Sequence, residues 1–270
     1  MQVGSLEFDV AQAGEGGRPL LLVHGFGGAK EDFGDFLADL AGLGWHAVAP
    51  DLRGHGGSAR AAGEDSYSFE LFVADVVGLA DALGWDRFVL LGHSMGGMVA
   101  QQLVLAHPER VDALILMGTS PGPPEGLITR EAALAGAHII RTQGLEAFHR
   151  LADPLGSPSH QRLVKERPGY AEFCEAKALS ASADMRCAML LAMVEQADRL
   201  EALRELRLPV LVIDGVEDTV MRAHGDRLAA TITGARRIVI DDAGHSPQFE
   251  NASAWWAAVS GFLDSLKSGL

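Results

Sequence analysis

The feature that most constrains the fold of this chain is an alternation of short apolar runs with segments of helical periodicity. Residues 19–25 (PLLLVHG) and 87–93 (RFVLLGH) are short and apolar, which is typical of buried strands. Between them, residues 68–84 place their apolar side chains on one face of a helix that stops at Gly84. Strands that alternate with helices predict right-handed crossovers and a parallel sheet covered on both faces.

The same alternation returns in both ends of the chain but is interrupted in the middle. The other expected strands are 46–54, 111–120, 208–218 and 235–245, and the other expected helices are 31–44, 95–108 and 253–267. Residues 121–207 contain only helical patterns. We therefore expect one α/β core domain, residues 1–120 and 208–270, with a helical insertion at 121–207. A separate second domain is disfavoured because it would cut the sheet in two.

Charge and hydropathy argue against several kinds of partner. The 270 residues carry a formal net charge of −14, which repels phosphate backbones and anionic lipid surfaces, so we expect neither nucleic acid nor membrane as partner. No apolar run approaches the roughly 20 residues that span a bilayer. Residues 1–10 lack the pattern of a signal peptide, and we expect a cytoplasmic protein.

Residues 89–103 (VLLGHSMGGMVAQQL) place Ser94 between Gly92 and Gly96. This spacing is a weak signal in a chain with 32 glycines. Here, however, it follows an apolar strand and opens a helix, which is the setting of a nucleophile elbow. In such a turn the strand and the helix nearly touch, so a Cβ at position 92 or 96 would collide. The segment predicts that Ser94 is a nucleophile.

A serine hydroxyl is a poor nucleophile without a base, and the base needs an acid to orient it. Of the ten histidines, His245 lies in the loop after the last expected strand, and we predict that it is the general base. Asp218, in the loop after the preceding strand, is the predicted acid, with Asp214 in reserve. His93 is expected to point away from its neighbour, and His24 to pack or hydrogen-bond beneath the glycine-rich loop that follows it.

Acyl transfer also requires amide donors for the oxyanion. The amide of Met95, directly after the nucleophile, is one predicted donor. The amide of Phe26, in the loop 24–28 (HGFGG), is the other. A phosphate-binding loop is the alternative for this glycine-rich segment, but the Gly-Lys-Ser/Thr ending of such loops is missing.

These segments resemble the α/β-hydrolase fold family in LLLVHGFGG, APDLRGHGGS, LLGHSMGGMVAQQLVLAHPERVDALILMGTSP, GVEDTVM and AGHSPQFENA. The order Ser94, Asp218, His245 is also that of the family. The resemblance implies an α/β fold with a mostly parallel, eight-stranded sheet flanked by helices. It further implies that the insertion at 121–207 is a helical lid over the active site.

Family resemblance also separates the candidate reactions. Family members that are haloalkane dehalogenases or epoxide hydrolases use an aspartate where this chain has Ser94. Many carbon–carbon bond hydrolases have asparagine and tryptophan at the positions of His93 and Ser246. We therefore expect hydrolysis of a carboxylic ester or lactone. The alternatives are a carbon–carbon bond hydrolase or lyase with the same triad, and a ligand receptor that keeps the triad with negligible turnover.

The expected substrate is a small ester or lactone with an apolar part. Its predicted contacts come from apolar side chains of the insertion, namely Phe148, Met185, Met189 and Met193. Three arginines of the insertion are expected to be exposed, so none is a dedicated anion site: Arg141, Arg150 and Arg186. The mechanism requires no metal ion and no organic cofactor, and we expect a monomer or a homodimer.

Overall fold

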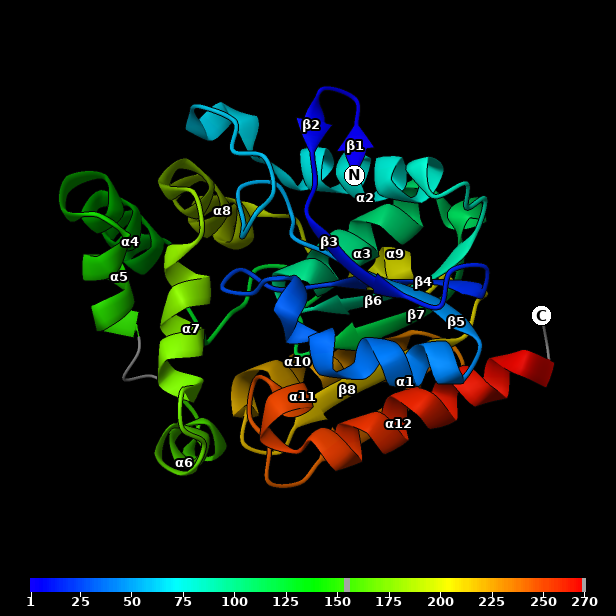
Figure 1. Ribbon diagram of the computed structural model, residues 1–270. Helices are drawn as coiled ribbons and strands as arrows, with labels where there is room; N and C mark the ends of the chain where they lie inside the picture. Colours follow the sequence, from blue (N-terminus) through cyan, green and yellow to red (C-terminus); the bar gives the residue numbers. More distant parts are fainter. Residues whose placement is uncertain (153–155, 269–270) are drawn as a thin grey trace.

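A seven-stranded sheet forms the centre of the protein (Figure 1). The computed structural model describes residues 1–152 and 156–268. The strands, in their order across the sheet, are β3 (Val10–Ala13), β5 (Trp45–Pro50), β4 (Arg18–Val23), β6 (Phe88–His93), β7 (Val111–Met117), β8 (Val210–Gly215) and β9 (Arg236–Ile240). Only β3 runs antiparallel to its neighbour, so the prediction of a mostly parallel sheet is confirmed.

The prediction of eight strands in this sheet is wrong. The two first strands, β1 (Gln2–Val3) and β2 (Leu6–Glu7), pair with each other as a separate antiparallel hairpin. Gly4 adopts a φ of 55° in the turn, a conformation that suits glycine. The side chain of Val3 packs on Gly78, so the hairpin lies on a helix rather than at the edge of the sheet.

Helices cover both faces of the sheet, as the alternation of strands and helices predicts. Side chains at successive strand positions point to opposite faces, so Leu20 and Leu22 belong to one buried core and Leu21 and Val23 to the other. The first core is covered by α1 (Leu37–Gly42) and α12 (Ala252–Ser265), and the second by α2 (Phe69–Ala82), α3 (Met95–Ala106) and α10 (Thr219–Thr231). The short helix α11 (Pro247–Glu250) precedes α12.

The expected helix 31–44 is only partly α-helical. It begins with two 3-10 turns, Lys30–Asp32 and Gly34–Phe36, and becomes α1 only at Leu37. Phe33, between the two turns, has φ −120° and ψ 1°, outside the helical range. Further 3-10 turns are Glu64–Ser66, Pro108–Arg110 and Leu266–Ser268.

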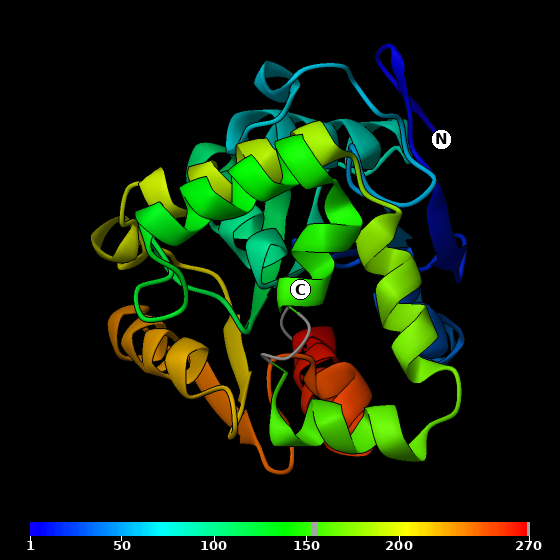
Figure 2. The same cartoon turned by 90° about the vertical axis from the view of Figure 1, so that its left-hand side faces the viewer.

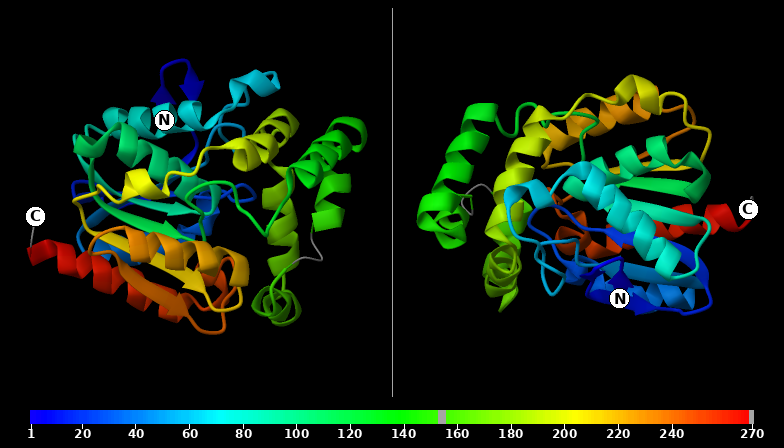
Figure 3. Two further views of the ribbon diagram at one scale, coloured as in Figure 1. Left: turned by 180° about the vertical axis from the view of Figure 1, so that it is seen from behind. Right: turned by 90° about the horizontal axis from the view of Figure 1, so that it is seen from above.

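Between β7 and β8 the described residues form helices and no strand. They are α4 (Arg130–Gln143), α5 (Leu145–Ala152), α6 (Pro158–Glu166), α7 (Tyr170–Leu179), α8 (Ala183–Glu195) and α9 (Leu200–Leu203). Helices α4 to α8 gather beyond one end of the sheet, the end toward which the parallel strands point (Figure 3), and α4 runs beside α8 (Figure 2). Within the described ranges, no helix is long and apolar enough to cross a bilayer.

Candidate active site

Ser94 is the single residue between the end of β6 and the start of α3. Its φ of 54° and ψ of −118° are unusual for a residue with a side chain. The turn is tight, because a Cβ on Gly92 would lie 2.4 Å from Gly96 O and a Cβ on Gly96 would lie 2.4 Å from Val23 O. Both glycines are therefore steric requirements, as the sequence predicts.

Backbone hydrogen bonds hold Ser94 in this conformation. Its N–H donates to Met117 O (2.8 Å), and Thr119 Oγ1 donates to Ser94 O (2.8 Å). Strain of this kind persists where the surroundings over-determine the backbone, and it is frequent at functional sites. Ser94 Oγ makes no hydrogen bond with any other described group, so the hydroxyl is available to a ligand.

We expect Ser94→Gly to raise the free energy of unfolding by about 1 kcal/mol, since glycine removes strain of about 1–3 kcal/mol but gains freedom in the unfolded chain. Chemical denaturation measures this change. Ser180→Gly is the control, because Ser180 has an ordinary φ of −74° and its replacement should destabilise. Equal destabilisation by both substitutions would show that residue 94 is unstrained.

The ring of His245 is held by Asp218. His245 Nδ1 donates to Asp218 Oδ2 at 2.6 Å, and Asp218 also begins α10, where its Oδ1 accepts from Met221 N–H (3.4 Å). The reserve candidate, Asp214, is buried elsewhere in an ion pair with Arg237 (2.8 Å). The geometry therefore brings Asp218, and not Asp214, to the imidazole, whose Nε2 stays free to handle a proton.

The carboxylate–imidazole contact shifts both pKa values in the direction that favours an ion pair. Burial lowers the pKa of His245, but the hydrogen bond and charge of Asp218 outweigh burial, so the net shift is upward from 6.5. Burial raises the pKa of Asp218, but the same hydrogen bond outweighs it, so the net shift is downward. The contact thus favours the charged forms of both groups, an Asp218 carboxylate beside a protonated His245.

Ser94 and His245 line one cavity of about 350 Å³. Its walls come from the loop 25–28, from α7, and from Met193 of α8. The loop approaches Ser94 closely, because a Cβ on Gly25 would lie 2.9 Å from Ser94 Cβ. A compact cavity with a strained serine and an oriented imidazole is suited to nucleophilic catalysis.

The backbone N–H groups of Phe26 and Met95, the predicted oxyanion donors, have no hydrogen-bond acceptor among the described residues. Buried histidines tie down the loop that carries Phe26. His24 Nε2 accepts from Leu52 N–H (3.0 Å), so its Nδ1–H donates to Gly25 O (2.8 Å). His55 Nε2 lies 3.1 Å from Phe26 O. Both amides are therefore unpaired while the neighbouring carbonyls are fixed.

Two side chains hold the loop of His245 through contacts that the sequence analysis did not predict. Glu250 Oε2 accepts from Gly244 N–H (2.7 Å) and Ser246 N–H (3.1 Å), the amides on either side of the base. His93 Nε2 donates to His245 O (2.7 Å), so this ring contacts the loop of His245. Burial, followed by the charge of His245, lowers the pKa of His93 to about 3, which keeps the ring neutral.

The predicted substrate-binding side chains are divided between the cavity and the core. Met193 lines the cavity with Ser94, and Phe148 lines an adjacent cavity. Met185 and Met189 are fully buried in the hydrophobic core instead. They point away from any ligand because α8 packs on α4 and on the loop around Gly54.

The cavity also contains a cation that the sequence analysis did not identify. Lys177 of α7 forms an ion pair with Asp32 (2.5 Å), and both side chains are mostly buried. The ammonium lies 4.5 Å from the ring centre of Phe173 and 4.9 Å from that of Phe249. The pair ties α7 to the 3-10 turn after β4 and leaves no net charge there.

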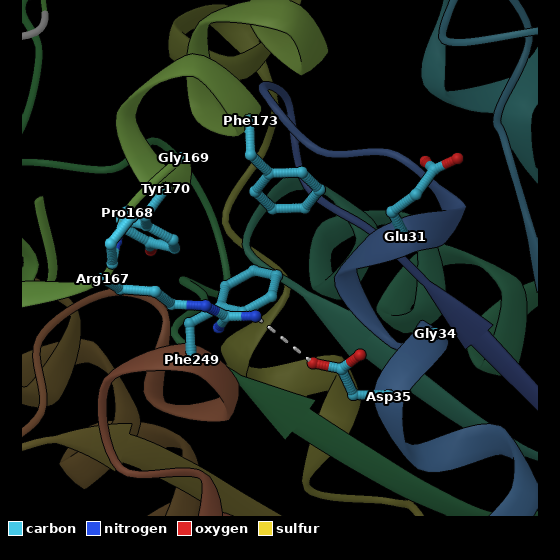
Figure 4. Close-up of a pocket in the computed structure, with 9 residues that line it drawn as sticks. All are labelled: Glu31, Gly34, Asp35, Arg167, Pro168, Gly169, Tyr170, Phe173 and Phe249. Atoms are coloured by element: carbon cyan, nitrogen blue, oxygen red, sulfur yellow. Dashed lines mark ion pairs between the residues drawn. The ribbon is translucent and has the colours of Figure 1, made fainter.

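A further cavity, of about 320 Å³, borders the aromatic side chains of α7 (Figure 4). Arg167 and Asp35 approach each other across it at 3.9 Å. It is lined by no serine, cysteine or histidine, so it does not offer the pairing of a hydroxyl or thiol nucleophile with an imidazole base. Across residues 1–152 and 156–268, no cluster of three or more His, Cys, Asp or Glu side chains could hold a metal ion.

Comparison with known proteins identifies the family of this chain and several relatives. The family model described as alpha/beta hydrolase fold matches residues 18–252. The 2-hydroxymuconate semialdehyde hydrolase of Pseudomonas sp. (strain CF600) is 32% identical over 92% of this chain and 87% of that protein. Epoxide hydrolase A of Mycobacterium tuberculosis is 37% identical, but over only 42% of this chain and 36% of that protein.

Among solved structures, the enol-lactonase of Burkholderia xenovorans LB400 superposes with a TM-score of 0.84. The two chains are 26% identical, and the match covers 97% of this chain and 98% of the enol-lactonase. The two proteins therefore share their fold over nearly their whole length.

Proposed function

The chain belongs to the alpha/beta hydrolase fold family, and from this premise we propose that it is a serine hydrolase that cleaves a carboxylic ester or lactone. The observation that carries the proposal is the contact of His245 Nδ1 with Asp218 Oδ2 (2.6 Å) beside the cavity that Ser94 lines. In this proposal Ser94 is the nucleophile, His245 the base and Asp218 the acid of a catalytic triad.

In the proposed mechanism, Ser94 Oγ attacks the acyl carbon while His245 Nε2 takes its proton. The N–H groups of Phe26 and Met95 stabilise the oxyanion, each by about 3–4 kcal/mol. The tetrahedral intermediate then breaks the ester bond, and the imidazolium gives its proton to the leaving alkoxide. Water, deprotonated by His245, attacks the acyl-enzyme in the same way and releases the acid and free Ser94.

We further propose that residues 121–207 act as a lid on a core formed by residues 1–120 and 208–270. Helices of this segment contribute Met193, Tyr170 and His160 to the walls of the cavity of Ser94. Such walls favour a substrate with an apolar part. The proposed boundaries include residues 153–155, which lie outside the described residues.

Two other activities use the same side chains and need an experiment to separate them. A carbon–carbon bond hydrolase is favoured by the 32% identity to 2-hydroxymuconate semialdehyde hydrolase. A receptor with negligible turnover is the other alternative, because an intact triad alone does not guarantee release of the acyl group.

A panel of p-nitrophenyl esters, lactones and a vinylogous 1,5-diketone tests the proposal. We expect steady-state hydrolysis of at least one ester or lactone at about 1 s⁻¹ or faster, and none of the diketone. Cleavage of the diketone without ester hydrolysis would instead identify a carbon–carbon bond hydrolase. A burst of p-nitrophenol without further turnover would identify a receptor.

A further inference from the structure

Arg186 of α8 is a cation buried without a counter-ion. Its residue surface is only 4% exposed, and it forms no ion pair with any carboxylate in the described chain. Nη2 donates to Ala178 O (3.0 Å), whereas Nε has no partner. Burial lowers the pKa of Arg186 to about 10, so the side chain remains charged at neutral pH. A buried charge without a partner is strongly unfavourable, and its presence calls for an explanation.

The other arginines of this helical segment that the sequence analysis singled out differ from Arg186. Arg141 pairs with Glu64 through two hydrogen bonds of 2.7 Å, and Arg150 is exposed to solvent. Lys177, the cation in the cavity of Ser94, is already neutralised by Asp32. Of these four cations, Arg186 is the one that is buried without a carboxylate partner among the described residues.

Arg186 faces an otherwise mainly apolar cavity of about 260 Å³, with walls that include Leu145 and Phe148. The guanidinium lies 4.4 Å from the ring centre of Phe26. Position 27 is a glycine, and a Cβ there would come to 3.8 Å from Arg186 Nη1. Gly27 and the guanidinium of Arg186 thus lie side by side in the wall of this cavity.

The cavity of Arg186 adjoins the cavity of Ser94. Phe26 and Gly27 line both of them, and the Phe26 N–H is a proposed oxyanion donor. One small molecule can therefore lie along this loop with a reacting carbonyl at Ser94 and an anionic group at Arg186. The planar guanidinium fork matches a carboxylate through paired hydrogen bonds.

We propose that Arg186 binds a carboxylate of the substrate, so that the preferred substrate is an ester or lactone that carries a second, ionised carboxylate. That the bound molecule is hydrolysed rests on the proposed function, whereas binding of a carboxylate by Arg186 does not. It replaces the expectation that this segment holds no dedicated anion site.

The test compares carboxylate esters with their neutral methyl esters. Two series are needed: monoesters of succinate to adipate carry the carboxylate on the acyl side, and acetoxy acids carry it on the alcohol side. We expect wild type to prefer the carboxylate form at least 10-fold in kcat/KM in one series. Arg186→Met should lose about 10- to 100-fold on that form and less than about 3-fold on its neutral ester. Arg150→Met is the control and should change neither.

Equal losses on both forms would overturn the inference, since Arg186 would then act only by supporting Phe26. If wild type shows no preference for the carboxylate form over the neutral ester in either series, the inference is also overturned. This comparison uses the wild-type protein alone and does not depend on the folding of a variant. Titration calorimetry with glutarate and adipate measures carboxylate binding to wild type and to Arg186→Lys independently of hydrolysis. Binding that weakens in the variant while no ester is cleaved would mean that the proposed function fails and the carboxylate site stands.

Discussion

Ser94→Ala is expected to reduce kcat/KM for the best ester by about 10⁵- to 10⁶-fold. The substitution removes the atom that forms the acyl-enzyme, and the remaining acceleration comes only from binding and the oxyanion donors. The fold should be unaffected, because alanine keeps a Cβ at the same φ of 54° and Ser94 Oγ makes no hydrogen bond that would be lost. Steady-state kinetics and a thermal melt measure the two expectations.

Ser253→Ala is the matched control for this experiment. Ser253 is an exposed hydroxyl on α12, and its loss should leave both turnover and melting temperature unchanged. Mass spectrometry of the wild type during turnover should find the acyl group on the peptide that contains Ser94. Activity above about 10% of wild type in Ser94→Ala, or acylation of another peptide, would contradict the proposed nucleophile.

The second large effect is expected for Asp218→Asn, which should lower kcat/KM by about 10³- to 10⁴-fold. An amide in place of the carboxylate can donate to Nδ1, so it favours the wrong tautomer of His245 and no longer stabilises the imidazolium. The pH profile should change too. In wild type, activity is expected to fall as the pH drops through the pKa of His245, which lies above 6.5, because only the neutral ring accepts a proton.

The amide introduced by Asp218→Asn carries no charge, so the pKa of His245 in this variant should fall and the acidic limb of the profile should move to lower pH. Asp241→Asn is the control, since Asp241 is only four residues from His245 in sequence but exposed. Its profile should match that of wild type. An unchanged acidic limb in Asp218→Asn would show that this carboxylate does not govern the base.

The sheet was predictable because it depends on local pattern. Buried parallel strands are continuous apolar runs, and Gly92 and Gly96 mark the tight turn at Ser94. The number of strands in the sheet was not predictable from these runs. A strand as short as β1, with two residues, shows no periodicity, and its sequence does not tell whether it pairs with the sheet or within a hairpin. Pairing of short segments is decided by what they pack against, in this case Gly78 of α2.

The walls of the site were less predictable than the fold, and α8 shows why. This helix is apolar on more than one side because it contacts both the core and the cavity, so periodicity does not distinguish Met193 from Met185 and Met189. Arg186 stands among these apolar residues, and only the fold reveals that it is buried. The contact of His93 with the His245 loop likewise joins residues that lie 152 positions apart and that no local motif relates.

The ion pair of Lys177 with Asp32 has a consequence for ligand exchange. Lifting α7 away from the sheet would separate two charges whose side chains are only 12% and 4% exposed, and breaking a pair of this kind is costly. The His245 ring, by contrast, is 42% exposed with the pair intact. Contact of a small molecule with the His245 ring therefore does not require this ion pair to separate or α7 to move away from the sheet.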